Sequence, residues 1–141
     1  MEFQTLNLLL KCGKEFGHRR IRERGVSETE CLLCSWIYAH PDCVQEDAAR
    51  ALHMDKTTAA KALAALERKG FVLRKKNPSD LRKNLLTLSE QGNARISEIL
   101  HLHDQWLEKI LSTLAPEEQQ QFEAYCDRLL LAAEELRKQQ N

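Results

Sequence analysis

Residues 71–88 interrupt an otherwise helical sequence, and this interruption constrains the fold more than any other feature. Residues 71–76 (Phe-Val-Leu-Arg-Lys-Lys) have the composition of a short strand, residues 77–80 (Asn-Pro-Ser-Asp) form a turn signal, and residues 85–88 (Leu-Leu-Thr-Leu) predict a returning strand. One β-hairpin inside a run of helices predicts a mainly helical fold with a small β element.

Helix start and stop signals divide the rest of the chain. Ser27 and Glu30 form a capping box that predicts a helix over 28–39, ending near Pro41. Asp55 as N-cap and Gly70 at the C′ position predict a helix over 56–69. Further helices are predicted for 2–16, from 45 through 52, from 90 to about 113 after an N-cap at Ser89, and from Pro116 onward. The predicted fold class is mainly α with a small β-hairpin wing.

Charge is distributed unevenly, although the formal net charge is zero. Residues 50–86 hold 10 Lys and Arg against 3 Asp and Glu, whereas both flanking segments are net acidic. The basic segment coincides with the 56–69 helix and the hairpin. A local basic patch of this kind favours a nucleic-acid partner.

Other classes are disfavoured by what the sequence lacks. It holds no Gly-rich phosphate loop, nucleophile elbow or paired-carboxylate motif, so an enzyme is not expected, and no cofactor is required. Its longest apolar runs are five residues, far short of the roughly twenty that span a bilayer, so no membrane association is expected. The N-terminus does not resemble a signal peptide, and the five cysteines are expected to be free thiols in a cytoplasmic protein.

The 56–69 helix has the features of a helix that enters the major groove of DNA. Its first two turns present Lys56, Thr57, Thr58 and Lys61, and the positive end of its dipole favours phosphate. Thr57 and Thr58 are short enough to reach base edges, although Thr58 could instead serve the cap at Asp55.

The hairpin extends the basic surface. Its candidate DNA contacts are Arg74, Lys75, Lys76, Arg82 and Lys83. Asp80 and Arg82 are two residues apart and therefore point to one side of an extended chain, where the carboxylate can hold the guanidinium for a narrow minor groove. The alternative is a surface ion pair that contributes little.

The segment from Gln45 to Gly92 resembles the winged-helix DNA-binding domain of the MarR (multiple antibiotic resistance regulator) family. The resemblance rests on 55–58 (Asp-Lys-Thr-Thr), Lys61, 66–72 (Leu-Glu-Arg-Lys-Gly-Phe-Val), the Asp80-x-Arg82 pair and 88–92 (Leu-Ser-x-x-Gly). Val44 and Ala115 depart from the family because hydroxyl N-caps are common at these positions; each departure affects capping by about 1 kcal/mol.

The resemblance implies one MarR-like domain over 1–141. Residues 1–25 and 113–141 would be dimerisation helices, 27–92 the winged-helix DNA-binding region and 90–113 a long connecting helix. It further implies a homodimer on a pseudopalindromic operator, usually as a repressor. Apolar stripes in 3–16 and 122–136, which need a partner surface, agree with a dimer.

The signal that such a regulator would sense stays open. Small aromatic or lipophilic effectors would meet His18, Arg19, Trp36 and His101, although Trp36 is more readily explained as core. Oxidants would act on Cys12, with Lys11 or Lys14 as activating cations, although a cysteine on an apolar face is usually inert. Zinc, a less favoured ligand, would draw on Glu30, Cys31 and His101, with Cys34 and His103 nearby in sequence.

A second class of function also stays open at this point. A winged-helix dimer could use its wing to contact protein or RNA without sensing any ligand. Steep salt dependence together with a sequence-specific palindrome would separate a DNA-binding regulator from such a module.

Overall fold

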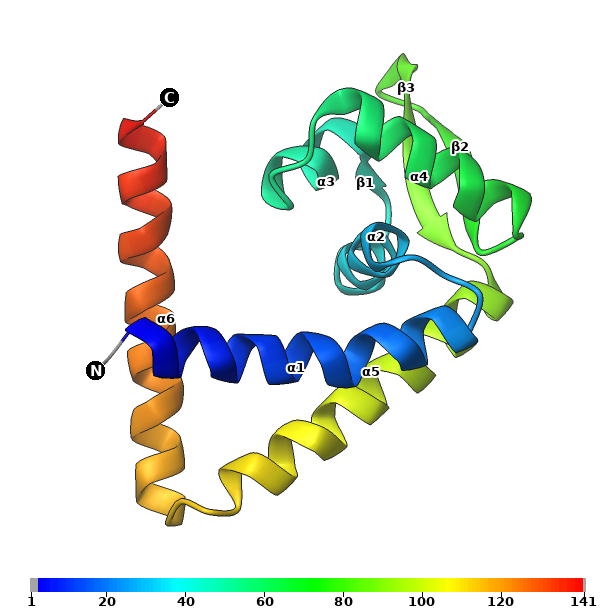
Figure 1. The fold of residues 1–141 in the computed structure, drawn as a ribbon. Helices are drawn as coiled ribbons and strands as arrows, with labels where there is room; N and C mark the ends of the chain where they lie inside the picture. The colour runs from blue at the N-terminus through cyan, green and yellow to red at the C-terminus, as the bar shows by residue number, and fades with distance from the viewer. Residues whose placement is uncertain (1–2, 141) are drawn as a thin grey trace. The chain divides into compact units, whose positions relative to one another are not determined.

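The computed structural model describes residues 3–140, which form six helices and three short strands (Figure 1). In chain order these are α1 (Phe3–Glu23), α2 (Glu28–Ala39), β1 (Cys43–Val44), α3 (Gln45–Ala51), α4 (Lys56–Arg68), β2 (Val72–Asn77), β3 (Asp80–Leu88), α5 (Glu90–Leu111) and α6 (Pro116–Gln139). The predicted mainly helical fold with one hairpin is confirmed.

The local signals in the sequence set the helix ends. Ser27 and Glu30 form both hydrogen bonds of the capping box, and Asp55 accepts from the backbone N–H of Thr58. Gly70 follows α4 with a φ of +74°, a conformation that favours glycine and turns the chain into β2. As expected, Val44 and Ala115 provide no side-chain cap.

The structure differs from the sequence prediction in three places. α1 continues to Glu23 because Ile21 adds another buried turn beyond residue 16. β3 starts at Asp80 rather than near Leu85, so the two hairpin strands pair up to the turn. β1 was not predicted; its two residues pair with Leu85 and Leu86, giving a sheet of order β1–β3–β2.

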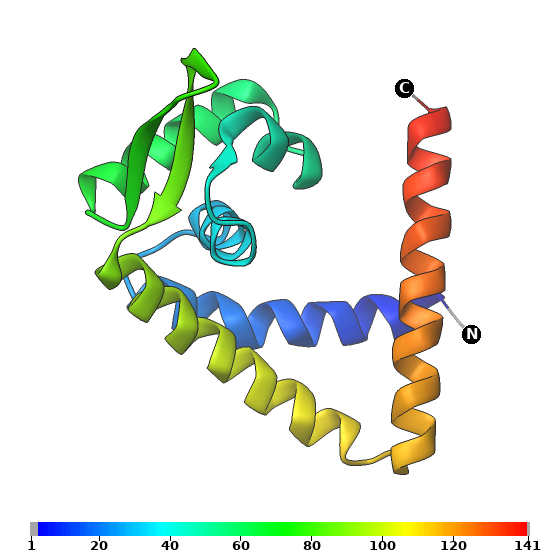
Figure 2. The same cartoon turned by 180° about the vertical axis from the view of Figure 1, so that it is seen from behind.

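A core of aliphatic side chains joins α2, α4 and the sheet. Leu33 and Ile37 of α2 are fully buried with Leu63 and Leu66 of α4 and Leu86 of β3. The hairpin runs along α4, as Figures 1 and 2 show from opposite sides. This packing leaves one side of α4 and the tip of the hairpin exposed.

The chain packs as two compact units, Met1–His103 and Asp104–Asn141. The second unit holds the end of α5 and all of α6. No residue of α6 is buried. Among residues 3–140, no helix combines the length and apolar content needed to cross a bilayer.

Candidate nucleic-acid interface and cavity

The N-terminal end of α4 is organised around Asp55. One carboxylate oxygen accepts from Thr58 N (2.8 Å) and the other from Thr58 Oγ1 (2.6 Å), and these bonds hold the pKa of Asp55 below its ordinary value. The hydroxyl proton of Thr58 is therefore engaged in the cap, which was the structural alternative for this residue. Its oxygen retains acceptor capacity, whereas Thr57 presents an exposed hydroxyl beside it.

The exposed side of α4 holds the predicted DNA contacts. Lys56, Thr57 and Lys61 are exposed, whereas Ala59, Ala62, Leu63 and Leu66 are buried. Small buried residues hold the helix close to the core, while the cations extend outward. The predicted contact residues therefore lie together on the exposed side of α4, at and near its N-terminal end.

Asp80 and Arg82 interact at the tip of the wing as predicted. Oδ1 of Asp80 accepts from the backbone N–H of Arg82 at 3.1 Å and from its Nε at 3.2 Å. The Arg82 side chain is 91% exposed, so the guanidinium is oriented without being withdrawn from solvent. Lys76 and Lys83 are also exposed on the wing.

Arg74, a predicted DNA contact, is bonded to two side chains of the same chain. Its Nε donates to Glu67 of α4 at 2.6 Å and its Nη1 to Gln45 at 3.2 Å. Both partners precede the hairpin in sequence and meet Arg74 only in the folded chain. The structure thus assigns Arg74 to joining the wing to α4 and α3, with its charge balanced by Glu67. Lys75 also lies near a carboxylate, 3.8 Å from Asp42.

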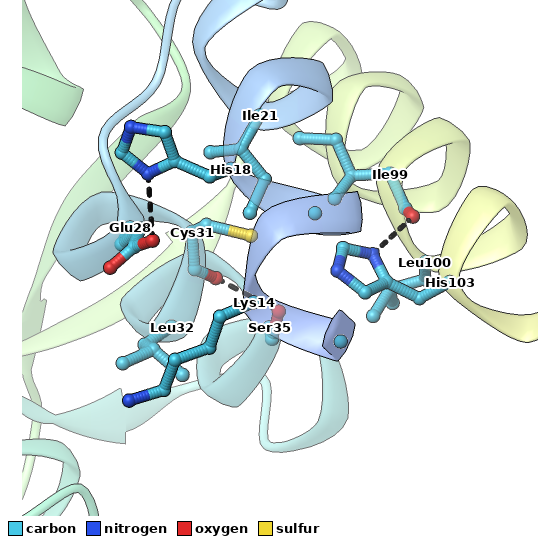
Figure 3. Close-up of a pocket in the computed structure, with 12 residues that line it drawn as sticks. Lys14, His18, Ile21, Glu28, Cys31, Leu32, Ser35, Ile99, Leu100 and His103 are labelled. Atoms are coloured by element: carbon cyan, nitrogen blue, oxygen red, sulfur yellow. Dashed lines mark hydrogen bonds and ion pairs between the residues drawn. The ribbon is translucent and has the colours of Figure 1, made fainter. Parts of the chain in front are cut away.

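A cavity of about 460 Å³ lies between α1, α2 and the middle of α5 (Figure 3). Its lining is mainly apolar, with a few polar groups. His18 Nδ1 of α1 lies 2.8 Å from Glu28 Oε1 of α2 beside it. The lining residues are Gly13, Lys14, Gly17, His18, Ile21, Glu28, Cys31, Leu32, Ser35, Ile99, Leu100 and His103.

Only one of the four residues predicted to line an effector site does so. His18 lines the cavity, whereas Arg19 pairs with Glu23 on the outside of α1. Trp36 packs against the core and stacks on His40 at 3.8 Å, and His101 is exposed outside the lining. Residues on one helix face recur every three or four positions. Arg19 is one position from His18, and His101 is two positions from His103, so both side chains point away from the cavity.

Sequence reasoning missed the close approach of α1 to α5 at this cavity. A Cβ at Gly17 would lie 2.6 Å from Nε2 of His103, whose Nδ1 donates to the Ile99 carbonyl at 2.9 Å. A glycine inside a long helix was the available signal, because it destabilises a helix unless close packing requires it.

The candidate metal ligands are not brought together. Within residues 3–140, no three His, Cys, Asp or Glu residues lie close enough to hold a metal ion. The predicted zinc site of Glu30, Cys31 and His101 is therefore not formed within a single chain. Glu30 instead pairs with Lys69, and burial raises the pKa of the Cys31 thiol. Cys12, the redox candidate, is exposed on α1, and its reactivity stays a prediction.

Comparison with known proteins supports one family. Residues 26–84 match the model of the MarR family. The chain is 29% identical to the HTH-type transcriptional regulator BilQ of Clostridium symbiosum (strain WAL-14163), over 75% of this chain and 74% of that protein. It is 29% identical to the uncharacterized HTH-type transcriptional regulator YwhA of Bacillus subtilis (strain 168), over 89% of each chain.

Solved structures share the fold across nearly the whole chain. The crystal structure of MarR superposes with a TM-score of 0.81 at 24% identity, covering 99% of this chain and 95% of that one. The S. aureus MepR–DNA complex superposes with a TM-score of 0.79 at 21% identity, covering 94% and 98%. The segment 26–84 of this chain belongs to the MarR family. The chain is therefore assigned to the DNA-binding transcriptional regulators.

The structure explains the Leu-Ser-x-x-Gly sequence of this MarR-family chain. Ser89 Oγ donates to the Gly70 carbonyl at 2.5 Å and accepts from Gly92 N at 3.0 Å, so it caps α5 while holding the turn after α4. A Cβ on Gly92 would lie 2.1 Å from the Phe71 carbonyl oxygen. The motif thus fixes the start of α5 against the base of the wing.

Proposed function

We propose that this chain is a homodimeric regulator that binds a palindromic operator, represses transcription there, and is released by a small aromatic or lipophilic molecule. The main support is that two elements suited to contacting DNA, α4 and the wing tip, are both exposed. Lys56, Thr57 and Lys61 lie on the uncovered side of α4, and the oriented guanidinium of Arg82 lies at the wing tip. These elements suit the major and minor grooves respectively.

Dimerisation is supported by large apolar side chains that are exposed on α6 and on α1 within residues 3–140. Phe122, Leu129 and Leu136 recur at seven-residue intervals on α6 and are 39%, 64% and 61% exposed. α1 adds Phe3, Leu8 and Leu10. Rows of exposed apolar side chains on a helix mark an interaction site. A two-fold dimer would cover it and present two α4 helices to successive half-sites, roughly 34 Å apart along B-DNA.

Release by a small molecule is supported by the cavity. Its volume of about 460 Å³ lies within the range of small-molecule sites, about 300–1,000 Å³. Ile21, Leu32, Ile99 and Leu100 provide apolar walls, while His18 and His103 provide polar groups. An aromatic or lipophilic molecule with one polar group fits this lining.

Selection of bound sequences from a randomised duplex pool, with purified reduced protein near physiological salt, tests the proposal. We expect a palindrome with half-sites roughly 10 base pairs apart. The recovered duplex then tests benzoate and uncharged aromatic compounds as releasing agents. Folded, dimeric protein that recovers no motif would contradict the proposal and favour a module that contacts protein or RNA.

A further inference from the structure

One carboxylate is buried among the described residues, and it belongs to Glu30. Its side chain lies in the first turn of α2, and the residue is 7% exposed. Oε2 accepts from the Ser27 backbone N–H at 3.0 Å and from Lys69 Nζ at 2.6 Å. A buried charge is strongly destabilising without a partner. Glu30 therefore holds Lys69 in one place.

Lys69 is the C-cap residue of α4, the helix with the predicted base contacts. Gly70 follows it and turns the chain toward the wing. Because Lys69 Nζ is anchored on α2, the ion pair fixes the end of α4 opposite the end that would meet DNA. The pair thus joins two elements 39 residues apart in sequence.

Apolar packing holds α4 against α2, and the ion pair adds a directional contact to it. Leu33, Leu63 and Leu66 are fully buried between α2 and α4, but hydrophobic contact is non-directional. A charge-assisted hydrogen bond at 2.6 Å is directional and fixes one geometry. The pair can therefore select one rotation of α4 among those that the apolar contacts allow.

The same turn of α2 also forms a wall of the cavity. Glu28 and Cys31 line the cavity (Figure 3). Glu30 lies between them in the sequence of α2. Successive helix positions turn by roughly 100°, so this turn has the cavity on one side and Lys69 on another. A shift of the turn at the cavity would move the anchor of α4.

We propose that Glu30 and Lys69 are positioning residues for DNA recognition: their ion pair holds α4 in the orientation that reads the operator, and links α4 to the cavity wall. This inference rests on the proposed function, because it assumes that α4 contacts DNA. Neither residue needs to touch DNA.

Operator affinity of matched variants tests this inference, with the duplex selected by the wild-type protein and a random duplex as probes. Glu30→Gln keeps the shape and the acceptor for Ser27 but removes the charge. Lys69→Met removes the partner, Lys69→Arg keeps the charge, and the double variant Glu30→Gln/Lys69→Met leaves no unpaired buried charge. Glu23→Gln, which removes the exposed pair with Arg19, is the control.

We expect Glu30→Gln and Lys69→Met each to weaken operator binding about tenfold, and the double variant to be no weaker than either, because both remove one interaction. Lys69→Arg should recover most of the affinity, and binding to the random duplex should change little. The dependence of affinity on salt should stay at the wild-type slope, whereas Lys61→Met, which removes a predicted phosphate contact, should lower it by about one.

Three outcomes would overturn the inference. One is operator binding by Glu30→Gln within about twofold of wild type, a difference too small for a positioning interaction. Another is additive losses in the double variant. The third is a lower salt slope for Lys69→Met with no effect of Glu30→Gln, which would make Lys69 a direct DNA contact.

Failure of the wild-type protein to select any operator would instead refute the proposed function, and this inference with it. Thermal unfolding of each variant identifies any loss of fold, and the double variant keeps the test valid if Glu30→Gln is unstable.

Discussion

Arg82 is held at the wing tip by a single oxygen of Asp80, which accepts both its backbone N–H at 3.1 Å and its Nε at 3.2 Å. The two bonds fix the chain direction and the guanidinium together. Because the Arg82 side chain is 91% exposed, this contact adds little to stability and instead limits the orientations of the guanidinium.

Arg82→Ala should weaken operator binding, because the guanidinium is the group suited to the narrow, strongly negative minor groove. Asp80→Ala should give a smaller loss, since it frees the arginine without removing it. Binding titrations against the selected duplex measure both losses, and thermal unfolding should be unchanged. If Arg82→Ala binds as tightly as wild type, the wing does not contact DNA in this way.

Gly92→Ala should lower the free energy of unfolding by about 1–3 kcal/mol, the usual effect of overpacking. The new methyl group would lie 2.1 Å from the Phe71 carbonyl oxygen, which belongs to the backbone at the base of the wing. Denaturant unfolding measures the change. Asn93→Ala, at an exposed position on the same turn, is the control for helix propensity. Equal stability of the two variants would contradict the close approach.

The elements that sequence reasoning predicted well are those with local signals. Ser27 and Glu30 define the start of α2, and Asp55 and Gly70 bracket α4, because each acts within a few residues of the boundary that it sets. The Asp80–Arg82 contact was predictable for the same reason. Alternation along an extended chain brings residues two apart to one side.

Contacts between distant segments were not predictable in this way. Arg74 has the sequence context of a wing cation, and only the packing of β2 beside α4 brings it to Glu67. Similarly, the capping box accounts for Glu30 fully within one helix, so nothing local indicated its bond to Lys69. The cavity combines three helices, and its lining depends on how each is rotated.

Arg74→Met should lower stability and Lys76→Met should lower operator affinity, although both remove a cation from β2. Arg74→Met breaks a half-buried contact with Glu67 and should lower stability by about 1 kcal/mol. Lys76 is exposed, so Lys76→Met should leave stability unchanged and lower both operator affinity and its salt slope. Denaturant unfolding and DNA titration at several salt concentrations distinguish the two. The reverse pattern would restore Arg74 as a direct contact.

Burial raises the pKa of the Cys34 thiol to about 12, with further contributions from Cys31 and the Glu30 carboxylate. In the unfolded chain this thiol ionises near its ordinary pKa of 9.0, so unfolding releases a proton between these two values. Its contribution to stability is therefore constant below pH 9 and declines as the pH rises toward 12. Between pH 7 and pH 10, Cys34→Ala should lose about 1 kcal/mol less stability than wild type. Parallel pH profiles in denaturant unfolding would contradict the shift.

Leu129→Glu should convert the proposed dimer to monomers and abolish tight operator binding. Leu129 is 64% exposed at the centre of an α6 stripe that runs from Phe122 to Leu136, and a carboxylate there would be buried without a partner in a dimer. Sedimentation velocity measures the association state, and DNA titration measures the loss. Gln120→Glu adds the same charge at an exposed position on the same helix outside the stripe and should leave both unchanged. The monomer should retain its winged helix, because the core of α2, α4 and the sheet contains no α6 residue. A Leu129→Glu protein that remains dimeric would show that the apolar stripe of α6 is not the dimer interface.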